Sequence, residues 1–215
     1  MKRKLFAIVT ILMAITCAFT ALTACSPDNG DEGGGETPAV KELAFELNSD
    51  NASYKVTGFK GEAFANIEIP DTYEGKPVTV IAKDAFKADG RKVRTVTVGK
   101  NVETIESGAF AGAANLTSFK FAEGSKIKTI KTGAIEAGTG FASLILPSSL
   151  ETIENEAFFG CDNVKIYLEV EAVPAGFQEG WDLIDFDTYG KKTVKADVML
   201  KGAWSLVDGV PTKNA

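Results

Sequence analysis

The stretch VTVGKNVETIESGAFAGAANL (Val96 to Leu116) recurs, with changes, as LILPSSLETIENEAFFGCDNV (Leu144 to Val164). Each copy begins with an apolar-x-apolar triplet, which is the period-two spacing of a strand with one buried face. An apolar pair at i, i+3 follows, then a small residue and phenylalanine, and finally a closing apolar residue. One such unit buries little alone, whereas stacked copies share a continuous core, so the pattern predicts a repeat solenoid.

Two further copies complete the series, from Ile67 to Val93 and from Phe119 to Phe141. In each copy the residue that follows the small residue serves as a marker. The four markers are Phe86, Phe110, Ile135 and Phe158, with spacings of 24, 25 and 23 residues along the chain. A fifth start, Ile166-Tyr167-Leu168, lacks the second half of the unit. We expect the marker side chains to lie in the core.

The repeat resembles that of the BspA-type leucine-rich repeat family of bacterial surface proteins, whose unit has an I-x-I-P start, V-x-x-I, A-F-x-G-C and a closing leucine. AFFGCDN at 157–163 is the most similar copy, and the resemblance covers roughly 53–182. Gly99 and Ala122 replace the proline, and Ile135 replaces the phenylalanine. The resemblance implies an α/β-type, strand-dominated solenoid with a short parallel sheet on its concave side. Small helical turns carrying the Ala-Phe step would lie opposite this sheet.

The ends of the repeat region predict caps. An N-terminal β-hairpin, Lys41 to Phe59 with its turn at 48–51, covers the first coil. Near the C-terminus, Thr193 to Leu200 has the pattern of a strand and Gly209-Val210-Pro211 that of a turn. The predicted organisation is a signal peptide (1–24), a lipidated cysteine with a flexible linker (25–40), a capping hairpin (41–66), the repeats (67–170) and a C-terminal cap and tail (171–215).

Side chains between the buried strand positions should point into solvent and form the candidate binding surface. They are Glu68, Thr95, Thr97, Ser118, Lys120, Ser143, Ile145, Lys165 and Tyr167. The alternative is a solvated sheet surface without a partner. Ile145 and Tyr167 are large and predicted to be exposed side by side, which favours a contact surface.

The N-terminus has the pattern of an export signal. Lys2, Arg3 and Lys4 precede an apolar run from Leu5 to Ala21, which is short for a membrane span and typical of a secretory signal. Leu22-Thr23-Ala24-Cys25 resembles the lipobox of bacterial lipoproteins, which implies that Cys25 carries diacylglycerol; Cys17 is a weaker competitor. The next 13 residues lack large apolar side chains and predict a disordered tether of at most about 45 Å.

Composition excludes several classes of function. Histidine is absent, which eliminates Ser-His-Asp and Cys-His catalysis and histidine zinc sites. The formal charge of −6 becomes −9 when the three cations of the signal peptide are removed, and an acidic surface disfavours nucleic acid. Cys161 is the one cysteine left for the folded part, and we expect it to be buried and unreactive. The sequence predicts no enzyme, no cofactor and no metal site.

The resulting hypothesis is a monomeric lipoprotein at the bacterial cell surface whose repeats bind an unknown protein or glycan. Members of the family it resembles are reported as adhesins. The alternatives are a non-adhesive structural component of the envelope, or a substrate-capturing subunit of a transporter or enzyme system. Trp181 and Trp204 would either stack on sugar rings as an exposed pair or, for Trp181, cover the last coil.

Overall fold

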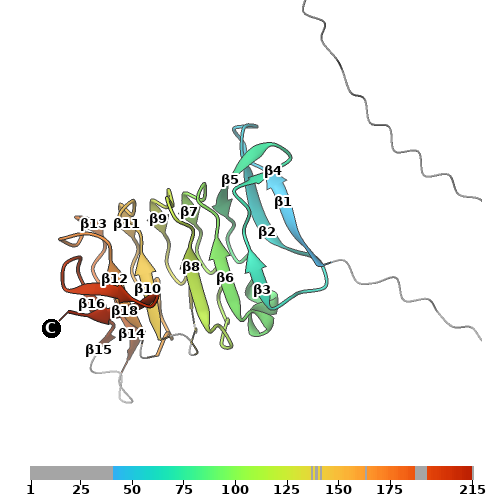
Figure 1. Cartoon of the computed structure of the whole chain (residues 1–215). Helices are drawn as coiled ribbons and strands as arrows, with labels where there is room; N and C mark the ends of the chain where they lie inside the picture. Colours follow the sequence, from blue (N-terminus) through green and yellow to red (C-terminus); the bar gives the residue numbers. More distant parts are fainter. Residues whose placement is uncertain are drawn as a thin grey trace, which may run out of the picture. The chain divides into compact units, whose positions relative to one another are not determined.

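The computed structural model describes residues 41–136, 138, 140, 142–162, 164–186 and 193–214. The predicted signal peptide, Cys25 and the linker lie outside the described residues, as does Phe141. The described residues belong to one compact unit, Pro38–Ala215. Figure 1 shows the strands of successive coils side by side along one axis, which confirms the predicted strand-dominated solenoid.

Each coil contributes one strand to a long sheet and one to a shorter parallel sheet. The long sheet has the order β1-β2-β5-β7-β9-β11-β13, and β4 pairs with β5. Its strands are β1 (Lys41–Leu47), β2 (Tyr54–Gly61), β4 (Thr72–Tyr73), β5 (Lys76–Ile81), β7 (Thr104–Ile105), β9 (Thr129–Ile130), β11 (Thr152–Ile153) and β13 (Gly176–Phe177).

The other strand of each coil lies in one of two short parallel sheets, β3-β6-β8 and β10-β12-β16. These strands are β3 (Asn66–Glu68), β6 (Thr95–Val98), β8 (Ser118–Phe121), β10 (Ser143–Leu146), β12 (Lys165–Leu168) and β16 (Asp197–Met199). β14 (Leu183–Phe186) and β15 (Thr193–Lys195) form one two-stranded sheet, and β17 (Trp204–Val207) and β18 (Val210–Lys213) form another.

The core lies between the long sheet and the short sheets. Val96 and Val98 of the triplet and Ile105 of the second pair are buried in it, as the period-two pattern predicts. All four marker side chains are buried, and the rings of Phe86 and Phe110 stack with their centroids 5.0 Å apart. Neighbouring coils therefore share one apolar core, which is why a single unit would not fold alone.

The predicted N-terminal hairpin is confirmed. β1 and β2 pair antiparallel across the turn at 48–53, and β2 then pairs in parallel with β5. The ring of Phe45 stacks on Tyr73 at 4.1 Å between centroids. The hairpin thus covers the first edge of the long sheet.

Three details differ from the sequence predictions. Helical geometry occurs after the first marker as the 3₁₀ helix η1 (Lys87–Lys92), whereas Phe110, Ile135 and Phe158 lie in turns. An earlier small-plus-aromatic step, Ala63-Phe64, precedes the first aligned copy; Ala63 is buried and Phe64 packs on Phe59. The C-terminal turn is formed by 208–209, and Val210 and Pro211 belong to β18.

The residue two positions before each marker has a positive φ, because the chain reverses sharply there. It is glycine in two coils, Gly108 and Gly133, but Glu156 has a φ of 55°. A residue with a side chain in this region costs about 1–2 kcal/mol. Replacing it with glycine removes this cost, but the gain is partly offset because glycine has greater freedom in the unfolded chain. We expect Glu156→Gly to raise the free energy of unfolding by about 0.5–1 kcal/mol, measured by urea denaturation.

The matched control is Glu151→Gly, which removes the same side chain at an exposed position without a positive φ. This variant should be destabilised, because there glycine adds freedom to the unfolded chain and relieves no strain. A Glu156→Gly protein less stable than the original chain would show that the contacts of the Glu156 side chain stabilise the fold by more than the backbone strain costs.

The C-terminal segment contributes a cap to the last coils, through β16 and Trp181. β16 pairs in parallel with β12 and extends its sheet by one strand. Trp181 is buried and its ring lies edge-on to Phe177, with centroids 5.0 Å apart, and near Phe158. Trp181 therefore covers the last coil, as one of the two sequence-based alternatives expects.

Candidate functional site

The nine predicted surface residues lie on the solvent side of the two short sheets, which we call the strand face. Strand register places them in rows, since Thr95 pairs with Ser118 and Thr97 with Lys120. On the second sheet Ser143 pairs with Lys165 and Ile145 with Tyr167. The described strands form two sheets that separate between β8 and β10, so the face has two halves.

Eight of these nine side chains are at least partly accessible to solvent. Glu68, Thr97, Lys120 and Lys165 are exposed, and the residues that are half-buried are Thr95, Ser118, Ser143 and Ile145. The strand face is therefore mainly polar, with Ile145 as its partly accessible apolar side chain.

Tyr167 is a correction, because its side chain is only 4% exposed. The ring of Trp204 covers it at 5.3 Å between centroids, and the indole Nε1 donates a hydrogen bond to the carbonyl of Leu168 at 3.2 Å. The prediction failed because β17 follows far along the chain and folds back over β12. Ile145 and Tyr167 consequently do not form an exposed pair.

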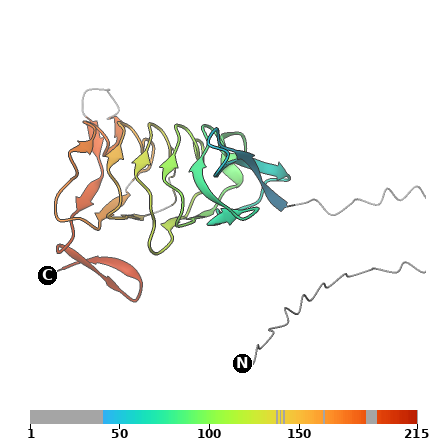
Figure 2. The same cartoon turned by 90° about the horizontal axis from the view of Figure 1, so that it is seen from above.

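The β17–β18 hairpin and the boundary between β8 and β10 enclose a pocket of about 560 Å³. Its sheet side includes Lys120 and Ile145, and its hairpin side includes Leu206 and Pro211. Figure 2 shows the hairpin extending beside the solenoid near the C-terminal end. The sequence did not predict this pocket, since its wall comes from the tail.

Several polar groups around the pocket have no protein partner. Among the residues that the structure describes, neither Lys120 nor Glu169 forms an ion pair. The hydroxyls of Ser118, Ser143 and Ser148 likewise make no side-chain hydrogen bond within the described part. These donors and acceptors are free to bind a ligand, and the pocket brings them together around one accessible volume.

The long sheet presents a different surface, with polar groups paired between coils. Its threonine row, Thr104, Thr129 and Thr152, occupies the same place in each copy and is half-buried. Next to this row, Lys128 Nζ lies 2.8 Å from Glu103, and Lys131 Nζ lies 2.7 Å from Glu106.

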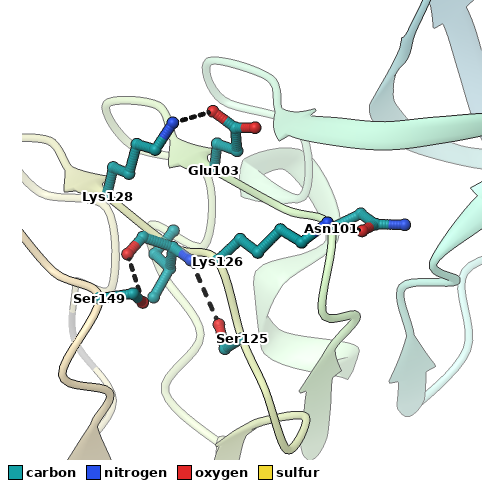
Figure 3. A network of polar contacts seen from close by, with 7 residues as sticks. Asn101, Glu103, Ser125, Lys126, Lys128 and Ser149 are labelled. Atoms are coloured by element: carbon teal, nitrogen blue, oxygen red, sulfur yellow. Dashed lines mark hydrogen bonds and ion pairs between the residues drawn. The ribbon is translucent and has the colours of Figure 1, made fainter.

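Polar contacts also join neighbouring coils in the turns that connect the long sheet with the short sheets (Figure 3). Lys126 Nζ donates to Asn101 Oδ1 at 2.9 Å, and the Ser149 hydroxyl donates to the carbonyl of Ile127 at 2.7 Å. These contacts link neighbouring coils, so the polar groups that make them are already partnered within the protein.

Cys161 is fully buried, and its thiol donates a hydrogen bond to the carbonyl of Ile135 at 3.0 Å. Burial raises the pKa of this thiol to about 12, because the thiolate would lose its hydration. The thiol therefore stays protonated at neutral pH, and the stability it contributes is lost as the pH rises above its ordinary value, 9.0, toward 12. Cys161 fits the predicted role of a small core residue.

We expect Cys161 in the folded protein to resist iodoacetamide at pH 8, because alkylation requires an accessible thiolate. Peptide mass spectrometry measures the modified fraction at this residue, and the urea-unfolded protein serves as the reactive control. Equal labelling in the folded and unfolded protein would contradict the described burial.

The two tryptophans do not form an exposed pair. Trp181 is buried in the cap, and Trp204 is half-buried against Tyr167. Within the described residues no group of three or more Cys, Asp or Glu side chains is arranged to hold a metal ion. The described part also contains no helix long and apolar enough to cross a membrane.

Stacked coils with one short strand per coil on one side define a leucine-rich-repeat-like β-solenoid. The sequence profile of the BspA-type leucine-rich repeat region matches residues 52–171 in six copies. The chain belongs to this family, as its repeat pattern indicated. The match begins at residue 52 and so includes the stretch around Ala63-Phe64 that precedes the four copies aligned from sequence.

Solved structures have the same fold. A leucine-rich repeat protein from T. pallidum superposes with a TM-score of 0.54 at 22% identity; the match covers 68% of this chain and 63% of that protein. A leucine-rich repeat protein from Bacteroides capillosus gives a TM-score of 0.50 at 26% identity, over 60% of this chain and 96% of that one. No curated protein sequence is significantly similar to the chain.

Proposed function

We propose that this chain is a non-enzymatic lipoprotein of the bacterial cell surface whose repeats bind a protein or glycan through the strand face. The observation that carries the proposal is the pocket beside Lys120 and Ile145. Within the described part of the chain, the Lys120 ammonium and the Glu169 carboxylate form no ion pair there, and three serine hydroxyls of the lining make no side-chain hydrogen bond. Leucine-rich-type solenoids typically present such a face to their partners.

The sequence supports the location. The cationic start, the apolar run and the lipobox ending in Cys25 favour export and lipidation, and the polar linker would hold the repeats outside the membrane. Ile145 and the surrounding polar side chains fit the usual composition of a binding surface, in which an apolar centre is bordered by polar groups.

Binding of the full detergent-solubilised chain to arrays of matrix proteins and of glycans tests the proposal. Lys120→Glu reverses a charge on the strand face, and Lys83→Glu makes the same change at an exposed, unpaired position elsewhere. Tyr167 is unsuitable as a test position because it is buried.

The proposal predicts a saturable hit that weakens about tenfold or more in Lys120→Glu and persists in Lys83→Glu, with unchanged melting temperatures. Equal binding by both variants would place the contact away from the strand face. Absence of any hit on either array would contradict the binding function and favour a structural component of the envelope.

A further inference from the structure

The β17–β18 hairpin is built so that its two faces differ. Ring contact places Trp204 toward Tyr167 on the sheet. Side chains alternate along a strand, so Leu206 points to the same side, and it lines the pocket together with its register partner Pro211. The adjacent pair Val207 and Val210 lies on the other side and is absent from the pocket lining.

The hairpin has a fixed position at its base. Besides the Trp204 indole bond to Leu168, the backbone N–H of Lys201 donates to the carbonyl of Val170 at 2.9 Å. At the tip, Asp208 and Gly209 have φ angles of 51° and 77°, which are typical of a tight type I′ turn. The hairpin is therefore attached to the solenoid at its base, and its tight turn sets the pairing of Leu206 with Pro211.

Leu206 is 57% exposed although it lies on the side of the hairpin that points toward the short sheets. The reason is that the tip overhangs the pocket instead of packing on β8 or β10. Across the pocket, Ile145 is half-buried, so two aliphatic side chains border one accessible volume of about 560 Å³. Pockets of about 300–1,000 Å³ with an apolar part and a few polar groups are typical ligand sites.

We infer that this pocket binds an extended peptide segment, with one aliphatic side chain of the peptide held between Leu206 and Ile145. The inference rests on the proposed binding function and specifies its ligand class. It assigns to the C-terminal hairpin a direct part in recognition, beyond the repeats themselves.

The polar lining matches the chemistry of a peptide main chain. Hydroxyls both donate and accept hydrogen bonds, and Ser118, Ser143 and Ser148 supply three of them around the pocket. Lys120 adds donors for peptide carbonyls, and Glu169 adds an acceptor for peptide N–H groups. The two unpaired charges are opposite, so they complement a backbone that carries both donors and acceptors.

A peptide fits this lining better than a sugar ring. Stacking of a sugar ring requires an accessible aromatic face, but Trp204 is packed on Tyr167 and Phe119 is buried. Phe121 lies on the same inward side of β8 as Phe119, and the two rings are edge-on at 5.5 Å between centroids. The aliphatic wall of Leu206 instead provides a place for an apolar side chain, whose burial stabilises a complex.

Selection of random linear twelve-residue peptides on phage against the full detergent-solubilised chain tests the inference, with a glycan array run in parallel. Leu206→Asp places a charge on the pocket wall. Val207→Asp is the matched control, because it makes a similar change in the adjacent, 53% exposed residue on the opposite side of the hairpin. Both positions are exposed, and thermal melting followed by circular dichroism checks that both variants are folded.

The expected result is that selected peptides share an aliphatic residue, and that Leu206→Asp weakens their binding about tenfold or more while Val207→Asp leaves it unchanged. Peptides that bind both variants equally would overturn the pocket assignment and leave the proposed binding function intact. Glycan hits lost in Leu206→Asp, with no peptide selected, would overturn the peptide class. If neither library nor the matrix-protein array yields a binder, the proposed function itself fails.

Discussion

Replacing Phe110 with alanine is expected to lower the free energy of unfolding by about 3–5 kcal/mol. The ring is fully buried, stacks on Phe86 at 5.0 Å and lies edge-on to Phe119 at 5.3 Å. It therefore joins neighbouring coils, and its removal would leave a cavity at the centre of the shared core. A loss of this size is a large fraction of the about 5–15 kcal/mol that stabilises a typical domain.

Urea denaturation followed by circular dichroism measures this effect. Phe121→Ala is the control, because it removes the same ring from a half-buried position on the next strand. We expect the control to lose markedly less stability than Phe110→Ala. Equal losses in the two variants would show that the stacked aromatic core does not couple the coils.

Replacing Cys25 with alanine is expected to abolish lipidation and to shift the protein from the membrane fraction to the soluble fraction. Each buried methylene of an acyl chain stabilises membrane binding by about 0.8 kcal/mol, and anchoring by two chains is stable where one is marginal. Cell fractionation and incorporation of labelled palmitate both report on this step.

Cys17→Ala provides the matched control, because Cys17 lies within the apolar run and is the other cysteine of the N-terminal segment. This variant should incorporate palmitate and remain in the membrane fraction. Lipidation that persists in Cys25→Ala, or is lost in Cys17→Ala, would contradict the lipobox assignment.

The repeat architecture was predictable from sequence because every coil repeats the same local pattern. Alternating residues such as Val96 and Val98 must share a strand face, and the marker phenylalanines must be buried for a coil to have a core. The alignment missed the Ala63-Phe64 step because no I-x-I triplet precedes it. The long strand β2, which pairs with the hairpin strand β1, lies there instead. Within the described ranges, a 3₁₀ segment follows the first marker alone, so helical turns are not a general feature of these coils.

The candidate site was predictable only in part. Period-two spacing places Lys120 and Ile145 on the solvent side, because that placement depends on local geometry alone. The burial of Tyr167 depends on Trp204, which contacts it from a hairpin that has no repeat pattern. The pocket likewise depends on Leu206, since periodicity within the repeats contains no information about where the tail folds.

Hydrogen exchange of the full chain, with and without a saturating partner from the arrays, tests most directly whether recognition occurs on the strand face. Amides in contact with a partner exchange more slowly, so the protected segments locate the interface. We expect protection in β8 and β10 together with the β17–β18 hairpin. Protection confined to β7, β9 and β11, with the strand face unchanged, would contradict it and place the interface on the threonine row of the long sheet.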